Sequence, residues 1–174
     1  SIRLLMAKDG LNLGARRITV STAGDVPGIN RFAQENRQVR LSVSLHAAND
    51  ALRSELVPLN RKYPLPALIA AVNDYIAQTG RQVTFEWALL KDTNDSEKDA
   101  DELLILAQKS KAHVNLIPYN PVTGLAYERP ADSTCAMFAR RLEAGGVSVT
   151  LRKERGQDID AACGQLRRRA SEAT

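Results

Sequence analysis

Cysteine is scarce in this chain. Its two cysteines, Cys135 and Cys163, stand far apart, and only two histidines, His46 and His113, accompany them. These residues do not have the spacing of a zinc site. They also do not form the disulfide framework that marks small secreted domains. The cysteine content therefore indicates a reducing compartment, and we expect a cytoplasmic protein.

Long apolar runs are missing as well. None approaches the roughly 18 residues that a membrane-spanning helix needs, so we expect no membrane partner. The chain has no glycine-rich loop that could cradle phosphate, and no serine in the sharp strand-to-helix turn of a hydrolase nucleophile. These absences disfavour phosphate-loop chemistry and serine hydrolysis.

What the chain does contain is the composition of an ordinary globular domain. Of its 174 residues, 44% are hydrophobic and 25% are charged, which is enough for one domain with a sizeable core. The formal net charge is +4. That charge is compatible with a phosphate-bearing partner but is also common among proteins without one.

Short β-branched runs alternate with helical stretches along the chain. The predicted strands cover residues 16–21, 39–45, 82–90, 113–118 and 147–151. The clearest helix begins near Pro64 and ends at Gly80, with apolar residues three and four positions apart. Further helices are expected to start near Pro27, Asn49, Ser96 and Asp132. Strands separated by helical crossovers form a parallel sheet, so we predict an α/β fold in one domain.

Five such units are too few to close an eight-stranded barrel. A partial barrel fits better. The chain also starts without Met, inside what reads as the tail of a helix that stops at Gly10. We therefore expect a fragment of a longer protein.

Neutral polar residues gather at the predicted carboxyl ends of the strands. The first strand ends in Ser21, while Ser44 and His46 lie at the end of the second and Asn120 follows the fourth. Ligands bind at this edge in parallel α/β folds. Each residue has a plainer explanation, since Ser21 and Asn120 can cap turns and His46 can be a hydrogen-bonded interior histidine. Together they predict a site for a polar small molecule.

The segment Arg152–Leu166 follows the last strand and carries the single thiol of Cys163. Small neighbours such as Gly156 and Gly164 leave little there to pack. Two readings stay open from composition. Cys163 is either a small buried hydrophobic residue or a reactive thiol delivered to the strand-end site.

Four segments of the chain carry a resemblance to a known family. They are Val-Ser-Thr-Ala-Gly at 20–24, Ser-Leu-His at 44–46, Asn-Leu-Ile-Pro-Tyr-Asn-Pro at 115–121, and Arg-Gly-Gln-Asp-Ile-Asp-Ala-Ala-Cys-Gly-Gln-Leu at 155–166. In this order they resemble the C-terminal half of the RlmN/Cfr family of radical S-adenosylmethionine (SAM) RNA methyltransferases. The resemblance implies that residues 1–174 are the C-terminal portion of a radical SAM core domain. The sheet would then be the C-terminal part of a partial (β/α)6 radical SAM barrel.

The resemblance also implies a reaction that uses SAM twice. One molecule would methylate Cys163, and a second would be cleaved reductively at a 4Fe-4S cluster to give a 5′-deoxyadenosyl radical. That radical would abstract hydrogen from the S-methyl group, and the resulting carbon radical would add to C2 of an adenine turned out of its stack in 23S rRNA and in tRNA. By the same resemblance, the residues that contact SAM are Ser21, Ser44, Leu45, His46 and Asn120. The implied enzyme is a monomer that takes electrons from a donor such as flavodoxin.

Several hallmarks of the family are absent from these 174 residues. They are the CxxxCxxC loop that holds the cluster, the Gly-Glu-Pro cofactor motif, the second essential cysteine and the acidic residue assigned as a base. Cys135 matches no family motif and is expected to pack in the core. We therefore expect the family activity of a longer parent protein, and no activity of this chain alone.

Three alternatives remain at this stage. A Cfr-type enzyme would methylate C8 of the adenine instead of C2. A non-catalytic RNA-binding domain held by arginines would bind in a salt-sensitive way and would be indifferent to Cys163→Ala. A thiol redox protein would lack its usual CxxC and would leave the Ser, His and Asn set without a role.

Overall fold

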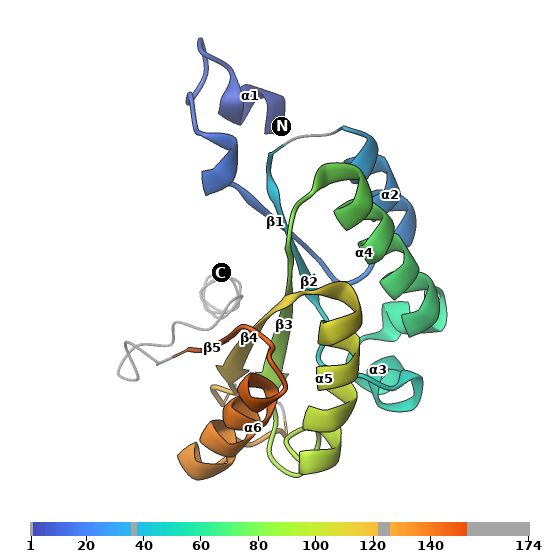
Figure 1. The fold of residues 1–174 in the computed structure, drawn as a ribbon, viewed down its shortest axis with the longest axis vertical. Helices are drawn as coiled ribbons and strands as arrows, with labels where there is room; N and C mark the ends of the chain where they lie inside the picture. Colours follow the sequence, from blue (N-terminus) through green and yellow to red (C-terminus); the bar gives the residue numbers. More distant parts are fainter. Residues whose placement is uncertain (1, 36–37, 122–125, 153–174) are drawn as a thin grey trace, which may run out of the picture.

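One parallel sheet organises the chain in the computed structural model, which describes residues 2–35, 38–121 and 126–152 (Figure 1). The strands are β1 (Thr19–Thr22), β2 (Arg40–Ser44), β3 (Val83–Leu89), β4 (His113–Pro118) and β5 (Val149–Leu151). All neighbouring pairs are parallel, and the order in the sheet is the order in the chain. Each new strand is therefore added to the same edge of the sheet, as in a segment of a β/α barrel, whereas doubly wound sheets add strands to both edges. The predicted parallel α/β fold is confirmed.

Helices fill the crossovers between the strands. These helices are α2 (Val26–Gln34), α3 (Asp50–Leu56), α4 (Leu65–Thr79), α5 (Glu97–Ser110) and α6 (Asp132–Ala144), with a 3-10 turn at Pro58–Arg61. Helix α1 (Ile2–Met6) and a 3-10 turn at Ala15–Arg17 precede β1. Helices α2, α4, α5 and α6 lie along one side of the sheet, and neighbours in this series pack on each other (Figure 1). In the described part of the chain, no helix is both long and apolar enough to cross a membrane.

The core lies between the sheet and these helices. Along β3, Phe85 and Trp87 are fully buried, and their alternation with the half-buried Thr84 and Glu86 gives the strand one packed face and one polar face. The Trp87 ring lies 5.9 Å from that of Phe138 on α6. The helix-facing side of the sheet therefore supplies stability, and the opposite side is left to polar residues.

Cys135 belongs to this core. It lies on α6, is 1% exposed, and its thiol pKa is raised by burial. The expectation that Cys135 is a packing residue is confirmed.

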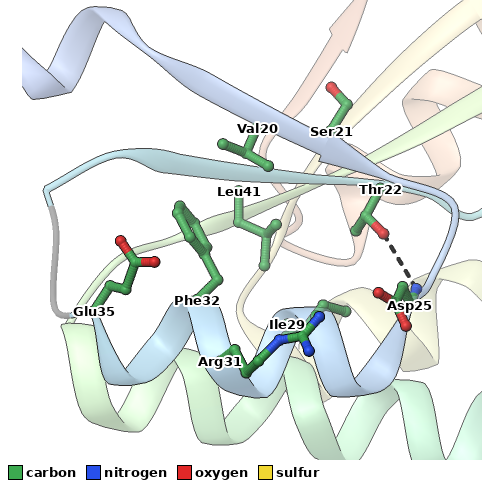
Figure 2. A pocket seen from close by; sticks show the side chains of 10 residues that line it. Val20, Ser21, Thr22, Asp25, Ile29, Arg31, Phe32, Glu35 and Leu41 are labelled. Carbon is green, nitrogen blue, oxygen red and sulfur yellow. Dashed lines mark hydrogen bonds between the residues drawn. The ribbon is translucent and has the colours of Figure 1, made fainter. Parts of the chain in front are cut away.

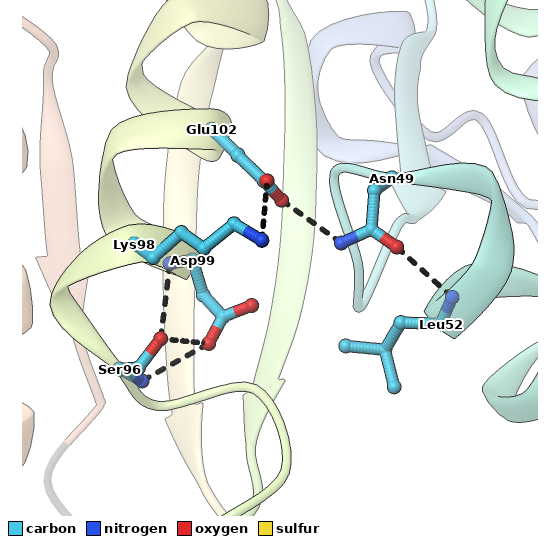
Figure 3. Close-up of polar contacts among 6 residues, drawn as sticks. All are labelled: Asn49, Leu52, Ser96, Lys98, Asp99 and Glu102. Atoms are coloured by element: carbon cyan, nitrogen blue, oxygen red, sulfur yellow. Dashed lines mark hydrogen bonds and ion pairs between the residues drawn. The ribbon is translucent and has the colours of Figure 1, made fainter.

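The loop after β2 is tied to α5 through Asn49. The side-chain oxygen of Asn49 caps α3 by accepting from the Leu52 N–H at 3.0 Å, and its Nδ2 donates to Glu102 at 2.9 Å (Figure 3). Helix α5 itself begins with a capping box formed by Ser96 and Asp99 (Figure 3). Two capped helix ends thus restrain the loop that follows His46.

Candidate cofactor site at the carboxyl ends of the strands

Ser21 and Ser44 lie on the polar face of the sheet. Ser21 is opposite Ser42 in the register of β1 and β2, and Ser44 is two residues further along β2. Figure 2 shows the Ser21 side chain pointing away from α2. Because side chains alternate along a strand, Ser44 shares the face of Ser42. The fold therefore brings these two predicted residues to the same side of neighbouring strands.

A cavity of about 310 Å³ lies on the other side of β1, against α2 (Figure 2). Its lining includes Val20, Leu41 and Phe32. Ser21 borders this cavity, but its hydroxyl points to the opposite side of the strand. The cavity is therefore separate from the polar strand-end set.

His46 has the most distinctive geometry of the predicted residues. Its backbone φ is +58°, which is uncommon for a residue with a side chain. Its Nδ1 accepts a hydrogen bond from the Ala88 N–H at 3.0 Å. Burial, followed by the positive charge of Arg53, lowers the His46 pKa to about 4, while Glu86 acts in the opposite direction. The ring is therefore neutral at pH 7, with its proton on Nε2.

This geometry combines the two readings of His46. One ring nitrogen is a satisfied interior acceptor, and the other is a hydrogen-bond donor with no partner among the described residues. The sequence offered the two roles as alternatives, whereas in the structure the engaged Nδ1 leaves Nε2 able to donate to a ligand.

Leu45 is placed differently. Its side chain is fully buried in the core. Its N–H donates to the Glu86 carbonyl at 3.0 Å, and its carbonyl accepts from Arg53 Nε at 3.2 Å. The buried side chain and the two backbone hydrogen bonds of Leu45 therefore fix the conformation of the loop that follows β2.

Asn120 follows β4 and is half-buried. The preceding residue, Tyr119, donates its N–H to the Leu89 carbonyl at 3.1 Å, which joins the ends of β3 and β4. Asn120 thus stands at the same carboxyl edge as Ser44 and His46. Cys163 lies outside the described residues, so its predicted role stays a prediction.

A carboxylate occupies the middle of the polar face. Glu86 accepts from Ser42 Oγ at 2.8 Å and from Asn115 Nδ2 at 2.6 Å. Both donors are neutral side chains on the two strands that flank β3. The network joins three strands and gives the polar face a negative centre.

Sequence reasoning missed two buried residues that organise the edge. Arg53 on α3 is 0% exposed and donates to backbone carbonyls at the ends of β1 and β2. Asn94 lies in the loop beyond β3. It is fully buried, and its Nδ2 donates to the carbonyls of His46 and Ala88, each at 2.8 Å.

No signal in the sequence marked Arg53 as buried, because a charged side chain on a helix is ordinarily exposed.

The described residues fit the two implied cofactors unequally. Hydroxyl, imidazole N–H and amide groups at one sheet edge suit a polar nucleoside with amino and carboxylate groups, as SAM is. The described ranges contain no group of three or more His, Cys, Asp or Glu residues that could hold a metal ion. They therefore do not supply ligands for an iron–sulfur cluster.

Solved structures share this architecture. A radical SAM methyltransferase from Sphaerobacter thermophilus matches with a TM-score of 0.90 and 52% identity, over 94% of this chain and 48% of that one. A domain of a pyruvate-formate lyase-activating enzyme from Bacteroides vulgatus matches with a TM-score of 0.60 and 13% identity, over 78% and 80%. The second match shows the fold alone. The fold and these matches place the chain among radical SAM domains.

Curated relatives define the family more closely. A protein of Pelotomaculum thermopropionicum is 53% identical over 169 residues, and one of Syntrophomonas wolfei is 51% identical over 167 residues. Each is named a probable dual-specificity RNA methyltransferase RlmN. The matches cover 96–97% of this chain and 46–47% of those proteins, so the chain spans about half the length of these relatives. No protein-family model matches the chain. Over nearly its whole length the chain is similar to RlmN proteins, which confirms the resemblance seen in the sequence.

Proposed function

We propose that residues 1–174 form the C-terminal portion of a radical SAM core domain, in an enzyme that methylates C2 of adenine in 23S rRNA and in tRNA. One observation carries this proposal. About half of the residues are identical, over nearly the whole chain, to proteins named dual-specificity RNA methyltransferases. The relatives are about twice as long as this chain. The proposal therefore concerns the longer parent protein and expects no activity of these residues alone.

The strand-end residues supply the cofactor contacts in this proposal. His46 donates from Nε2, because its Nδ1 is engaged by the Ala88 N–H. The hydroxyls of Ser21 and Ser44 and the amide of Asn120 act as short hydrogen-bonding groups around the same edge. A ring that stays neutral well below pH 7 is suited to donate a hydrogen bond without adding charge.

When bound, SAM supplies both the methyl group and the hydrogen-abstracting radical. The role proposed for Cys163 is to accept the methyl group on sulfur and present it to the base. Such a route suits the target, because a C–H carbon of an electron-poor purine ring is not nucleophilic and a polar methyl transfer to it fails.

The remaining partners belong to the same proposal. The ligands of the 4Fe-4S cluster would come from the part of the parent protein that this chain does not cover. An electron donor such as flavodoxin would reduce the cluster, and the enzyme would act as a monomer in the cytoplasm on an RNA base held out of its stack.

Nucleoside mass spectrometry tests the proposal. The full-length parent is expressed in cells that lack their own adenine-C2 methyltransferase, and 23S rRNA and tRNA are digested to nucleosides. We expect 2-methyladenosine with the parent protein and none with its Cys163→Ala variant. 8-Methyladenosine would overturn the regiochemistry and favour a Cfr-type enzyme. RNA that stays unmethylated, while the purified parent holds cluster and binds SAM, would contradict the proposed activity.

A further inference from the structure

Arg53 is the one charged residue that is fully buried in the described part of the chain. Its Nε donates to the Leu45 carbonyl at 3.2 Å. Its Nη2 donates to the Ala23 carbonyl at 2.8 Å and to the Ser44 carbonyl at 3.3 Å. Because these carbonyls end β1 and β2, a single guanidinium joins the two loops that carry Ser21, Ser44 and His46.

The positive charge of Arg53 is not neutralised by direct contact with a carboxylate. Its Nη1 donates to Asn60 Oδ1 at 2.8 Å, and Asn60 Nδ2 in turn donates to Asp50 Oδ1 at 2.9 Å. All four acceptors of the guanidinium are thus neutral oxygens. A buried cation with only neutral acceptors costs more free energy than an apolar side chain of the same size would. Such a cost points to a role beyond core packing.

The turn after β1 is shaped to leave room for the guanidinium. Gly24 has φ +111°, and a Cβ built on it would lie 3.0 Å from Arg53 Nη2 and 3.3 Å from Leu68 Cδ2. Thr22 Oγ1 accepts from the Gly24 N–H at 3.1 Å and so fixes the same turn. Backbone conformation and side-chain space at this position therefore both suit the buried arginine.

The charge of Arg53 also reaches the imidazole of His46. Together with burial it keeps the His46 ring neutral, while the carboxylate of Glu86 on the polar face opposes it. The edge thus has a cation beneath the β1 and β2 loops and an anion on the face of β3.

We propose that Arg53 is a positioning residue for the cofactor edge, which holds the β1 and β2 loops in their binding geometry. The proposal rests on the proposed function where it concerns SAM. The positive charge of Arg53 also acts on the His46 ring, and the two effects are separable, because the geometry depends on the forked guanidinium and the charge does not. Arg53 acts through the residues around it, without touching the reacting atoms.

The test uses the full-length parent with Arg53→Met and Arg53→Lys, the pH titration of the His46 ring by nitrogen-15 NMR, and SAM affinity by calorimetry. In Arg53→Met we expect the His46 pKa to rise, while burial still keeps it below its ordinary value, and SAM binding to weaken about tenfold or more. In Arg53→Lys the His46 pKa should stay low, because the positive charge at position 53 is kept. SAM binding should still weaken, because the three N–H groups of a lysine sit on one nitrogen and cannot reproduce the fork by which Nε and Nη2 reach separate carbonyls.

Tyr75→Phe is the matched control. It removes a buried hydrogen bond of 2.9 Å to the Val39 carbonyl just before the other end of β2, so it disturbs the same strand far from the edge. Its His46 titration and SAM affinity should equal those of the unmodified protein. An Arg53→Met protein that shows both values unchanged would overturn the proposal, and so would a Tyr75→Phe protein that shows the same changes.

Two further outcomes are decisive. If Arg53→Met does not fold, Arg53→Lys carries the test, and unchanged SAM affinity in that variant refutes the geometric role. If the unmodified parent does not bind SAM, the proposed function fails. The His46 titration then still decides the effect of Arg53 on the ring.

Discussion

The backbone N–H of Ala88 donates to Nδ1 of His46 at 3.0 Å, and this contact places the ring proton of the neutral histidine on Nε2. The contact crosses from β3 to the end of β2, so it depends on the register of two parallel strands. The register of the two strands therefore decides which ring nitrogen of His46 carries the proton and can donate to a ligand.

Lowering the pH should destabilise the fold through His46. Its pKa is about 4 in the folded protein, against 6.5 in an unfolded chain, so the unfolded chain takes up this proton first as the pH falls. The stabilisation that His46 contributes is complete above pH 6.5 and is lost as the pH falls toward 4, by about 3 kcal/mol in total. The free energy of unfolding, measured with urea at several pH values in this range, should decrease as the pH falls, and its slope against pH measures the effect. His46→Asn, which does not titrate there, should show a shallower one, and equal slopes would contradict the assignment.

The variant His46→Asn should separate folding from binding. Asparagine tolerates positive φ, and its Oδ1 can accept from the Ala88 N–H as Nδ1 does. We expect the free energy of unfolding at pH 7 to change by less than about 1 kcal/mol, within the usual range for a tolerated substitution. SAM affinity of the full-length parent should fall roughly 5- to 30-fold, the equivalent of one lost hydrogen bond. Undiminished affinity by calorimetry would remove His46 Nε2 from the site.

Removal of the Asn94 side chain should destabilise the loops at the carboxyl ends of β2 and β3. Asn94 donates to the carbonyls of His46 and Ala88 and accepts from the Leu90 N–H at 2.7 Å. Because Asn94→Ala leaves one buried and two partly buried backbone groups without these partners, we expect about 3 kcal/mol of destabilisation in urea unfolding. Asn30→Ala, at an exposed position of α2, is the control and should cost less than about 1 kcal/mol. Equal effects would show that the Asn94 hydrogen bonds are unimportant.

A pair of glycine variants tests the room left for Arg53. Gly24 and Gly80 both have positive φ, but a Cβ at Gly80 would meet nothing within 4 Å. Gly80→Ala should therefore cost only the backbone strain, about 1 kcal/mol, and Gly24→Ala should cost about 1–2 kcal/mol more. Thermal unfolding of the two variants side by side measures the difference. If the two costs are the same, the turn at Gly24 is not shaped by the guanidinium.

Much of the fold could be predicted because its signals are local. The helix from Leu65 to Thr79 is marked by its apolar spacing and by Gly80, and β4 has the predicted bounds. The first strand was placed three residues too early. Ala15–Arg17 forms a 3-10 turn, closed by a hydrogen bond from the Ile18 N–H to the Ala15 carbonyl, before the extended segment begins. Strand propensity alone did not exclude that turn.

The site was predictable in part for a different reason. Parallel strands collect their carboxyl ends at one edge, so Ser44 and His46 could be placed there from the order of the chain alone. Arg53 could not, because a long charged side chain on a helix predicts solvent exposure. Its three backbone acceptors come from segments that only the tertiary structure brings together. The role of Cys163 follows from family resemblance and lies outside the described residues.

The state of the Cys163 thiol tests the central claim most directly. The full-length parent is produced with its cluster and with SAM, purified together with its cofactors, and the peptide that contains Cys163 is sequenced by tandem mass spectrometry. The proposed function predicts a single methyl group on the Cys163 sulfur and none on Cys135, which is buried in the core. An unmodified Cys163 in protein that holds an intact cluster and binds SAM would contradict it.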